Sequence, residues 1–393
     1  MYLVVASLLL GGVFAILFLL RWRKTAKAYL VLAGPAVALA VMTYFSIWGS
    51  PGWARNFEIA TYPRVRSLDK RRFCDSASMN PSGMTQDNGH KIVAGALRSP
   101  AVAEFVRASV KAGYLEFFGA HNDEACGMVN HAFDRLSRSQ RDGVDPNQLI
   151  NVTSALLEDT FRKSDPSFWF NRIYHRYKTQ TKPEIDFQQL KKLLPGKGVL
   201  DYGCGSGYLA ARLAKGGYNV FTTDVLDYRY AEARHLPFVQ MTSATDISYP
   251  DDSVDVALVL AVLHHINPED LPRVIQRLRK IARYALIKED TFGLPDQVEG
   301  LAESLTTQPL LRTFVAMPLA VQQQVLALID FFANAIAQGL PEMNMPFEFK
   351  TITEWEQVLR QYGFKVNKTL VVGFEPGRMH KSCHVWLVCE RTT

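Results

Sequence analysis

A glycine-rich turn between an apolar strand and a helix constrains the fold of this chain more than any other feature. The strand covers Gly198–Tyr202, and the turn after it carries Gly203, Gly205 and Gly207. Apolar residues within 209–214 then recur at helical spacing. Glycine lets a backbone approach a ligand closely, and a helix N-terminus offers free N–H groups to an anion or a nucleotide. The pattern therefore predicts a ligand-binding opening in an α/β fold.

The spacing of the glycines excludes two common nucleotide-binding motifs. The dinucleotide fingerprint G-x-G-x-x-G requires a third glycine at position 208, where this chain has Tyr208. A phosphate-binding P-loop ends in Lys-Ser or Lys-Thr, and neither pair closes this turn. What remains is a G-x-G-x-G turn followed by a helix.

Further strands follow the turn in a regular order. The segment 218–224 reads as a second strand that ends in Asp224, and 251–260 reads as a turn and a fourth strand. The segment 284–290 reads as a fifth strand, while 364–372 and 384–389 read as a closing antiparallel hairpin.

Together these segments resemble the class I S-adenosylmethionine-dependent methyltransferases, and in particular the subgroup called type 11, over residues 165–391. The resemblance implies a Rossmann-like seven-stranded sheet of order 3-2-1-4-5-7-6. It implies S-adenosylmethionine as cofactor, and it implies that the carboxylate of Asp224 accepts hydrogen bonds from both ribose hydroxyls. The cofactor residues implied by the motif are Asp201, Gly203, Gly205, Gly207 and Asp224.

The expected adenine contact departs from the family. Many relatives carry an aspartate at the start of the loop after the third strand, where this chain has Ser243. Ala244 and Asp246 follow it. The resemblance therefore leaves three sources for the adenine contact: the side chain of Ser243, the side chain of Asp246, or the backbone of Ala244.

Candidates for a general base lie where the fourth and fifth strands end, because open parallel sheets bind ligands at the carboxyl ends of their strands. His264 and His265 follow the fourth strand, and Glu289 and Asp290 end the fifth. For the histidines the alternative is a structural role, with one capping and one packing. For the two acids it is a helix cap or a solvated surface.

The first fifty residues differ from the rest of the chain. Residues 2–20 and 28–48 contain no charged side chain, and each run is about the roughly 20 residues that a helix needs to cross a bilayer. The intervening segment 21–27 holds four basic residues, and the chain starts without the basic region of a signal peptide. We predict an uncleaved membrane anchor of two apolar helices within residues 1–52, which contacts the membrane through residues 1–50. The alternative is a pair of buried core helices.

The topology of this anchor follows from two conflicting arguments. Basic loops prefer the cytosol, so the segment 21–27 would place everything after residue 48 outside. S-adenosylmethionine is made in the cytosol, however, and for this reason we expect the catalytic domain on the cytosolic side of the membrane. The anchor would then be a hairpin that enters and leaves on one side.

Two further regions complete the predicted organisation. Residues 53–164 read as a linker, irregular up to about residue 90, followed by a small helical unit over 95–163. Residues 165–393 form the predicted methyltransferase domain, with a helical insert at about 296–340. Apolar residues of that insert either line a pocket, dock on a membrane or pack in the core.

Composition limits the possible partners. The 44 basic and 38 acidic residues give a net charge of only +6, and they are spread along the chain, so we expect no nucleic-acid binding. Five cysteines without a C-x-x-C pair argue against a disulfide scaffold, and we expect no metal.

The sequence thus predicts a membrane-anchored methyltransferase with a small-molecule or lipid-like acceptor. The alternative is a non-catalytic methyltransferase-fold scaffold or assembly protein at the membrane. In that alternative the helical unit at 95–163 binds a protein partner.

Overall fold

The computed structural model describes residues 83–142, 148–227, 229–341, 343 and 345–392. All of them belong to one compact unit, residues 64–393. The predicted membrane anchor at 1–52 and most of the predicted linker lie outside the described residues.

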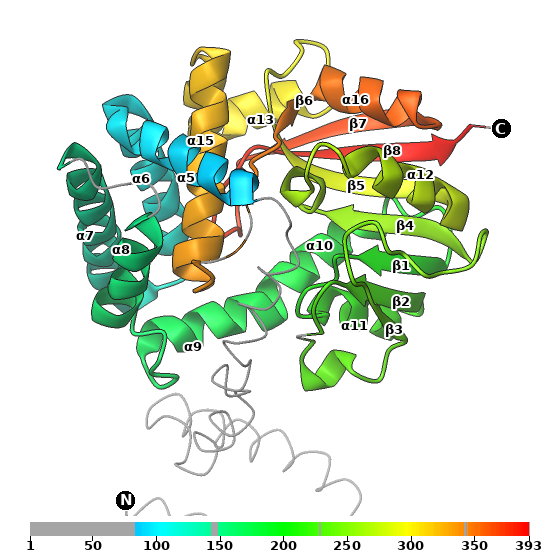
Figure 1. Cartoon of the computed structure of the whole chain (residues 1–393), viewed down its shortest axis with the longest axis horizontal. Helices are drawn as coiled ribbons and strands as arrows, with labels where there is room; N and C mark the ends of the chain where they lie inside the picture. Colours follow the sequence, from blue (N-terminus) through cyan, green and yellow to red (C-terminus); the bar gives the residue numbers. More distant parts are fainter. Residues whose placement is uncertain (1–82, 143–147, 228, 342, 344, 393) are drawn as a thin grey trace, which may run out of the picture. The chain divides into compact units, whose positions relative to one another are not determined.

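A twisted, mainly parallel sheet forms the centre of the unit (Figure 1), with strand order β3-β2-β1-β4-β5-β8-β7. The strands up to β5 pair in parallel, and β8 runs antiparallel to both β5 and β7. This order confirms the predicted one, and a short additional strand, β6, pairs with the end of β5. The strands are β1 (Gly198–Tyr202), β2 (Asn219–Asp224), β3 (Phe238–Gln240), β4 (Val254–Leu260), β5 (Ala282–Phe292), β6 (Lys350–Thr351), β7 (Phe364–Gly373) and β8 (His384–Arg391).

The central strands are near-continuous apolar runs because helices cover both of their faces. One face packs against α10 (Lys182–Leu190) and α11 (Tyr208–Lys215), which contribute Phe187 and Leu213 to a common core cluster. The other face packs against α12 (Leu271–Ile281) and α16 (Ile352–Gln361). Carboxyl ends of the parallel strands therefore remain as the edge of the sheet where a ligand can bind.

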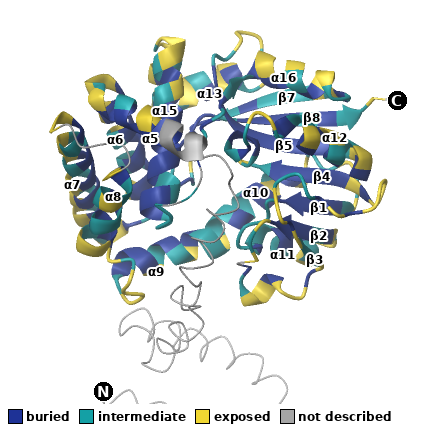
Figure 2. Ribbon diagram, viewed as in Figure 1, coloured by how far each residue is buried: buried dark blue, intermediate teal, exposed yellow. Residues whose placement is uncertain are grey.

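A helical region precedes the sheet and borders this edge (Figure 1). Its helices are α5 (Gly83–Arg98), α6 (Pro100–Leu115), α7 (Asn122–Arg141) and α8 (Leu149–Leu156), and α9 (Trp169–Arg176) leads through η5 (Tyr177–Thr181) into α10. Figure 2 shows buried residues on the inward faces of these helices and throughout the central strands. Residues of this region and of the sheet belong to one apolar cluster, so the helices and the sheet share a core.

The insert after β5 is helical, as predicted, and consists of α13 (Leu301–Thr307), α14 (Pro309–Val315), α15 (Leu319–Phe331) and η8 (Phe332–Ala337). Phe314, Phe331 and Phe332 are buried in the main core. Among the described residues, one helix, Leu319–Ala337, is long and apolar enough to cross a membrane, and 56% of its apolar window is buried inside the unit. Of the three roles predicted for this insert, these residues show core packing.

One sequence expectation was wrong in part. Residues 53–90 read as irregular linker, but α5 already begins at Gly83. The prediction rested on prolines, on Gly83 and on polar residues with little periodicity, and such a pattern does not exclude a helix. Within this helix, a Cβ at Gly89 would lie 2.5 Å from the carbonyl oxygen of Met345. Glycine is needed there because a helix packs closely against another segment, and no turn is involved.

Candidate functional site

The glycine turn is fastened to the end of β2. Gly203 and Cys204 both donate their backbone N–H to the carbonyl oxygen of Thr223, at 2.9 and 3.1 Å. The N–H of Gly205 donates to Oδ2 of Asp224 at 2.8 Å. These bonds bring the turn after β1 and the acid at the end of β2 together, as the sequence predicted for a shared binding site.

At two positions of the turn, both the backbone conformation and the lack of space for a Cβ atom require glycine. Gly203 and Gly207 have φ of 74° and 75°, in the left-handed region that favours glycine. A Cβ at Gly203 would lie 2.7 Å from Val262, and one at Gly207 would lie 2.5 Å from the Cβ of Ala233. Larger residues would therefore push the turn away from its neighbours.

Two buried carboxyl groups face this turn. Burial raises the pKa of Asp224, against the hydrogen bond from Gly205. Burial and the neighbouring charge of Asp224 raise the pKa of Asp201 to about 7. A ligand that carries hydroxyl donors and a positive charge would stabilise both carboxylates, which fits the ribose and the sulfonium of S-adenosylmethionine. The residues present thus fit this cofactor.

The loop after β3 is stabilised by its own hydrogen bonds. Asp246 accepts from the N–H and hydroxyl of Thr242 and from the hydroxyl of Ser248, which hold its pKa below the ordinary value. The hydroxyl of Tyr202 donates to the carbonyl oxygen of Ala244 at 2.7 Å. Ser243 is exposed. The carboxylate of Asp246 thus shapes the loop, and the adenine contact from Ser243, Asp246 or the backbone of Ala244 stays a prediction.

Aromatic rings beside the glycine turn were missed by the sequence reasoning. Tyr208 begins α11, and its ring lies 4.8 Å from that of Tyr230, which in turn lies 5.9 Å from His175 of α9. The N–H of Tyr230 donates to the carbonyl oxygen of Ser206 at 3.1 Å. No sequence motif predicts this aromatic group, because Tyr208, Tyr230 and His175 come from three separate segments of the chain.

Glu289 of β5 and His264, which follows β4, form a fully buried pair. The sequence ended the fifth strand at Asp290, but β5 continues to Phe292, because its last two residues pair with β6. Oε2 of Glu289 lies 2.5 Å from Nδ1 of His264. Oε1 of Glu289 accepts the N–H groups of Val262 and Leu263 at 3.0 and 2.8 Å. Both oxygens of Glu289 are therefore engaged in holding the turn after β4, and its chemistry here is structural positioning.

A second carboxylate approaches this pair from α15. Oδ1 of Asp330 lies 3.7 Å from Nε2 of His264 and 3.7 Å from Nε2 of His265, and it accepts from Nδ2 of Asn334 at 2.7 Å. Burial alone would lower the pKa of His264, but Glu289 and Asp330 outweigh it and hold that pKa well above its ordinary value. His264 is thus a cation between two carboxylates.

Within the described residues, the side chains of His264, His265 and Asp330 are the ones that could together bind a metal ion. His264, His265 and Asp330 each offer a ligand atom, and these atoms lie within 4.8 Å of one another. A protonated His264 between Glu289 and Asp330 accounts for this arrangement without an ion.

Asp290 is the candidate whose pKa suits proton transfer. Its carboxylate lies 3.3 Å from Nε2 of His384 on β8, and it is buried. Burial raises the pKa of Asp290 to about 6, although His264 and Ser382 oppose this. Burial and the charge of Lys288 hold the pKa of His384 well below its ordinary value, so His384 is neutral. No sequence pattern couples Asp290 with His384, because their pairing depends on the antiparallel register of β5 and β8.

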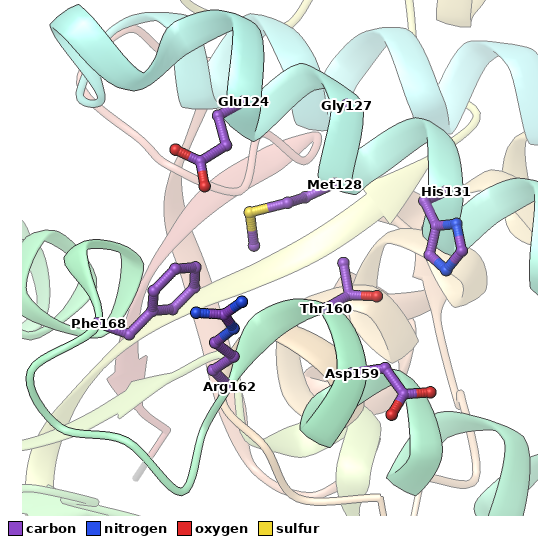
Figure 3. A pocket seen from close by; sticks show the side chains of 8 residues that line it. All are labelled: Glu124, Gly127, Met128, His131, Asp159, Thr160, Arg162 and Phe168. Atoms are coloured by element: carbon purple, nitrogen blue, oxygen red, sulfur yellow. The ribbon is translucent and has the colours of Figure 1, made fainter.

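A surface cavity of about 350 Å³ lies away from these groups, on the helical region (Figure 3). Figure 3 shows Glu124, Met128 and His131 on α7 facing Arg162 and Phe168. None of its lining residues belongs to the sheet or to the turns at the strand ends. It is therefore distinct from the predicted cofactor site.

Comparison with known proteins identifies the kind of domain. Residues 200–284 match a family model described as a methyltransferase domain. No curated protein sequence gives a significant match. Similar solved structures include the 1,6-didemethyltoxoflavin-N1-methyltransferase of Burkholderia thailandensis, with bound 1,6-didemethyltoxoflavin and S-adenosylhomocysteine, at 15% identity and a TM-score of 0.34. That match covers 63% of this chain and 91% of the other.

Another similar structure is the magnesium protoporphyrin IX methyltransferase of Synechocystis, with bound S-adenosylhomocysteine. It is 16% identical with a TM-score of 0.32, and the match covers 56% of this chain and 84% of the other. At such values the acceptors of these enzymes say nothing about the acceptor of this chain. Residues 200–284 thus match a methyltransferase domain, and the carboxyl-lined glycine turn fits S-adenosylmethionine as its cofactor.

Proposed function

We propose that this chain transfers a methyl group from S-adenosylmethionine to an acceptor bound over the carboxyl ends of β4 and β5, and that Asp290 takes up the proton of the acceptor. One observation carries the proposal. Asp290 lies at this edge with a pKa of about 6, so much of it is ionised near neutral pH and it can accept a proton.

The cofactor supplies a methyl group on a positive sulfur, which leaves readily as a thioether. What the chain must do is hold the acceptor in line at short range and remove its proton. Glu289 and His264 fix the turn after β4, and Asp330 joins this turn to the insert. Asp290 would take up the proton that the acceptor atom loses as it is methylated.

The other three predicted catalytic residues have different roles in this proposal. Both oxygens of Glu289 are occupied by the turn, and His264 is fully buried and cationic, so these two are positioning residues. The side chain of His265 is 14% exposed and lies beside Asp330, where it can contact the acceptor.

An extract assay tests the activity without knowledge of the acceptor. The full-length chain in detergent is incubated with cell extract and methyl-labelled cofactor, and the label is partitioned between organic and aqueous phases. Label in the organic phase indicates a lipid-like acceptor, and label in the aqueous phase indicates a soluble one. Asp290→Asn should abolish most of the transfer, whereas Asp296→Asn, an exposed acid after the same strand, should not. Full transfer by Asp290→Asn would exclude Asp290 as the base.

We also propose that residues 1–50 anchor the chain in a membrane with the catalytic domain on the cytosolic side. The two uncharged runs support the anchor, and the cytosolic origin of the cofactor supports the orientation. Reporter fusions placed after Trp48 test it: we expect signal from a cytosolic reporter, and signal from an external reporter alone would contradict the orientation.

A second candidate function is that of a non-catalytic assembly protein whose helical region binds a partner. The cavity between α7 and the segment around Arg162 is the observation that favours it, because it lies outside the methyltransferase site. Calorimetry separates the two functions. Tight binding of S-adenosylmethionine, with slow turnover to S-adenosylhomocysteine, supports the enzyme, and the absence of binding supports the assembly protein.

A further inference from the structure

The helix formed by α15 and η8 connects the strand ends with a second group of charged residues. Asp330 and Asn334 lie next to His264 and His265. Ala337 and Gln338 follow seven and eight residues after Asp330, at the far end of the π-helical segment η8. At that distal end the helix meets two lysines from other segments.

Both lysines bind the end of this helix. Nζ of Lys163 donates to the carbonyl oxygen of Ala337, and Nζ of Lys178 donates to Oε1 of Gln338 at 3.3 Å. Each side chain is partly buried. An ammonium group has three N–H donors, so these contacts leave donors on both lysines for another acceptor.

This pair of ammonium groups has no counter-charge of its own. Among the described residues, no carboxylate forms an ion pair with Lys163 or with Lys178. The nearest acid that acts on Lys178 is Asp186, which is already paired with Lys182, Lys288 and Arg378. Burial and mutual repulsion lower the pKa of Lys163 to about 7, and burial and Lys182 lower that of Lys178 to about 7.

Further polar atoms without partners lie in the same place. Among the described residues, neither Nε2 of His380 nor the hydroxyl of Tyr114 has a hydrogen-bond partner, and both atoms are buried. Their rings lie 5.9 Å apart. Burial and the charges of the two lysines lower the pKa of His380 to about 3, whereas Asp330 opposes this.

Aromatic rings form the walls around these polar groups. Nζ of Lys163 lies 4.8 Å from the ring centroid of Phe170 and 4.4 Å from that of Tyr174. The rings of Tyr174 and Phe332 lie 6.0 and 6.5 Å from that of His380. The site therefore combines uncompensated positive charge with apolar walls, which is the chemistry that binds an organic anion.

A structural role for the lysines explains only part of this arrangement. Cations at a helix C-terminus are favourable, and each lysine contacts that end of the helix. One cation would suffice for this purpose, and a helix end gives no reason for the unpartnered atoms of His380 and Tyr114. A bound anion would satisfy all four groups.

We infer that the acceptor of this methyltransferase is an elongated organic acid whose carboxylate or phosphate binds between Lys163 and Lys178, next to His380 and Tyr114. The inference rests on the proposed function, because it takes the strand ends as the place of methyl transfer. The anionic group then binds at the far end of η8, and an apolar body extends along η8 and α15 from there to the strand ends beside Asp330.

Calorimetry with two simple probes tests the site directly. Benzoate and phenyl phosphate are titrated into the full-length chain in detergent, saturated with S-adenosylhomocysteine. We expect one of them to bind at a single site, and the stronger probe tells a carboxylic acid from a phosphate. Lys163→Met and Lys178→Gln should each weaken this binding about tenfold or more, as the loss of a charge-assisted hydrogen bond would.

Three controls make the result decisive. Lys365→Met removes an exposed lysine on β7 and should leave binding unchanged. Lys178→Arg keeps the charge and should retain most of the binding. Each variant must still bind S-adenosylhomocysteine, which shows that it is folded.

The outcomes also separate this inference from the proposed function. Failure of both probes to bind the S-adenosylhomocysteine complex at millimolar concentration would overturn the anion site, and so would equal binding by the lysine variants and wild type. Neither result affects methyl transfer in the extract assay. Conversely, probe binding at the lysines with no methyl transfer in extract would support the anion site and contradict the proposed methyltransferase activity.

Discussion

Oε2 of Glu289 on β5 lies 2.5 Å from Nδ1 of His264, and both side chains are fully buried. The other oxygen of Glu289 holds two backbone N–H groups of the turn that carries His264. This one carboxylate therefore sets the conformation of the turn at the end of β4, beside Gly203, whose missing Cβ leaves room for Val262 of the same turn.

Replacing Glu289 by glutamine should cost about 3 kcal/mol of unfolding free energy, because it leaves the buried cation of His264 with one carboxylate instead of two. Chemical denaturation measures the loss. Glu269→Gln, at an exposed glutamate close to the same turn, should change the stability by less than about 0.5 kcal/mol. Equal effects from the two variants would show that the Glu289–His264 pair does not stabilise the fold.

Replacing Asp224 by alanine should weaken cofactor binding by about 1–3 kcal/mol, since a charged hydrogen-bond partner of the ribose is lost. Calorimetry with S-adenosylmethionine measures this. Asp296→Asn changes an exposed acid and serves as the comparison. Unchanged affinity in Asp224→Ala would mean that the end of β2 does not bind the cofactor.

The pH dependence of methyl transfer should report the proton acceptor. A base with a pKa of about 6 must be ionised, so kcat/KM should rise with pH through about 6 and then level off. At pH 5 the rate should be roughly a tenth of the plateau, because the pH is then about one unit below the pKa of the Asp290 carboxyl group. Asp290→Asn should be slow at every pH and lack this rise; a retained rise would assign the titration to another group.

Replacing Gly207 by alanine should destabilise the chain by about 2–3 kcal/mol, from a positive φ and from overpacking against Ala233. Gly217→Ala is a matched control: its φ is 84°, but a Cβ there would meet nothing within 4 Å. The control should lose only about 1 kcal/mol, from backbone strain alone. Equal losses at 207 and 217 would contradict the steric part of the argument.

Lys163 and Lys178 should make the stability of the fold depend on pH. Their pKa values are about 7 in the folded chain, compared with about 10.4 for an unfolded lysine. Between these values the unfolded state binds more protons than the folded state. The unfavourable contribution of the two lysines to folding therefore shrinks, and the free energy of unfolding increases, as the pH rises from about 7 to about 10. The stability of a Lys163→Met, Lys178→Met double variant, relative to wild type, should therefore fall as pH rises. A relative stability that is constant over this range would show that the two lysines are not perturbed.

The central strands could be predicted because each is a short apolar run with a recognisable turn at its end, whereas their order in the sheet followed from the resemblance to class I methyltransferases. Asp224 could be placed beside the glycine turn because the carboxyl ends of neighbouring parallel strands meet at one edge. The helical insert was also predictable, since its apolar residues recur at helical spacing over more than thirty residues.

Long-range pairings could not be predicted from patterns. His384 meets Asp290 only through the register of β5 and β8, and Asp330 reaches His264 only because α15 packs beside β5. Lys163 and Lys178 look like solvated lysines in the sequence, because nothing near them shows that the end of η8 lies against both. Such contacts depend on packing between distant segments, and this packing produces no periodic pattern of residues in the sequence.

The common core of the helices and the sheet has a consequence for engineering. Val106 of α6, Phe133 of α7 and Leu326 of α15 lie in the same cluster as Ile287 of β5. A chimera that grafted residues 165–393 onto a different leader would expose this apolar surface to water, and such fragments aggregate. A transplant of the enzyme must therefore carry the helices from residue 83 onward with it.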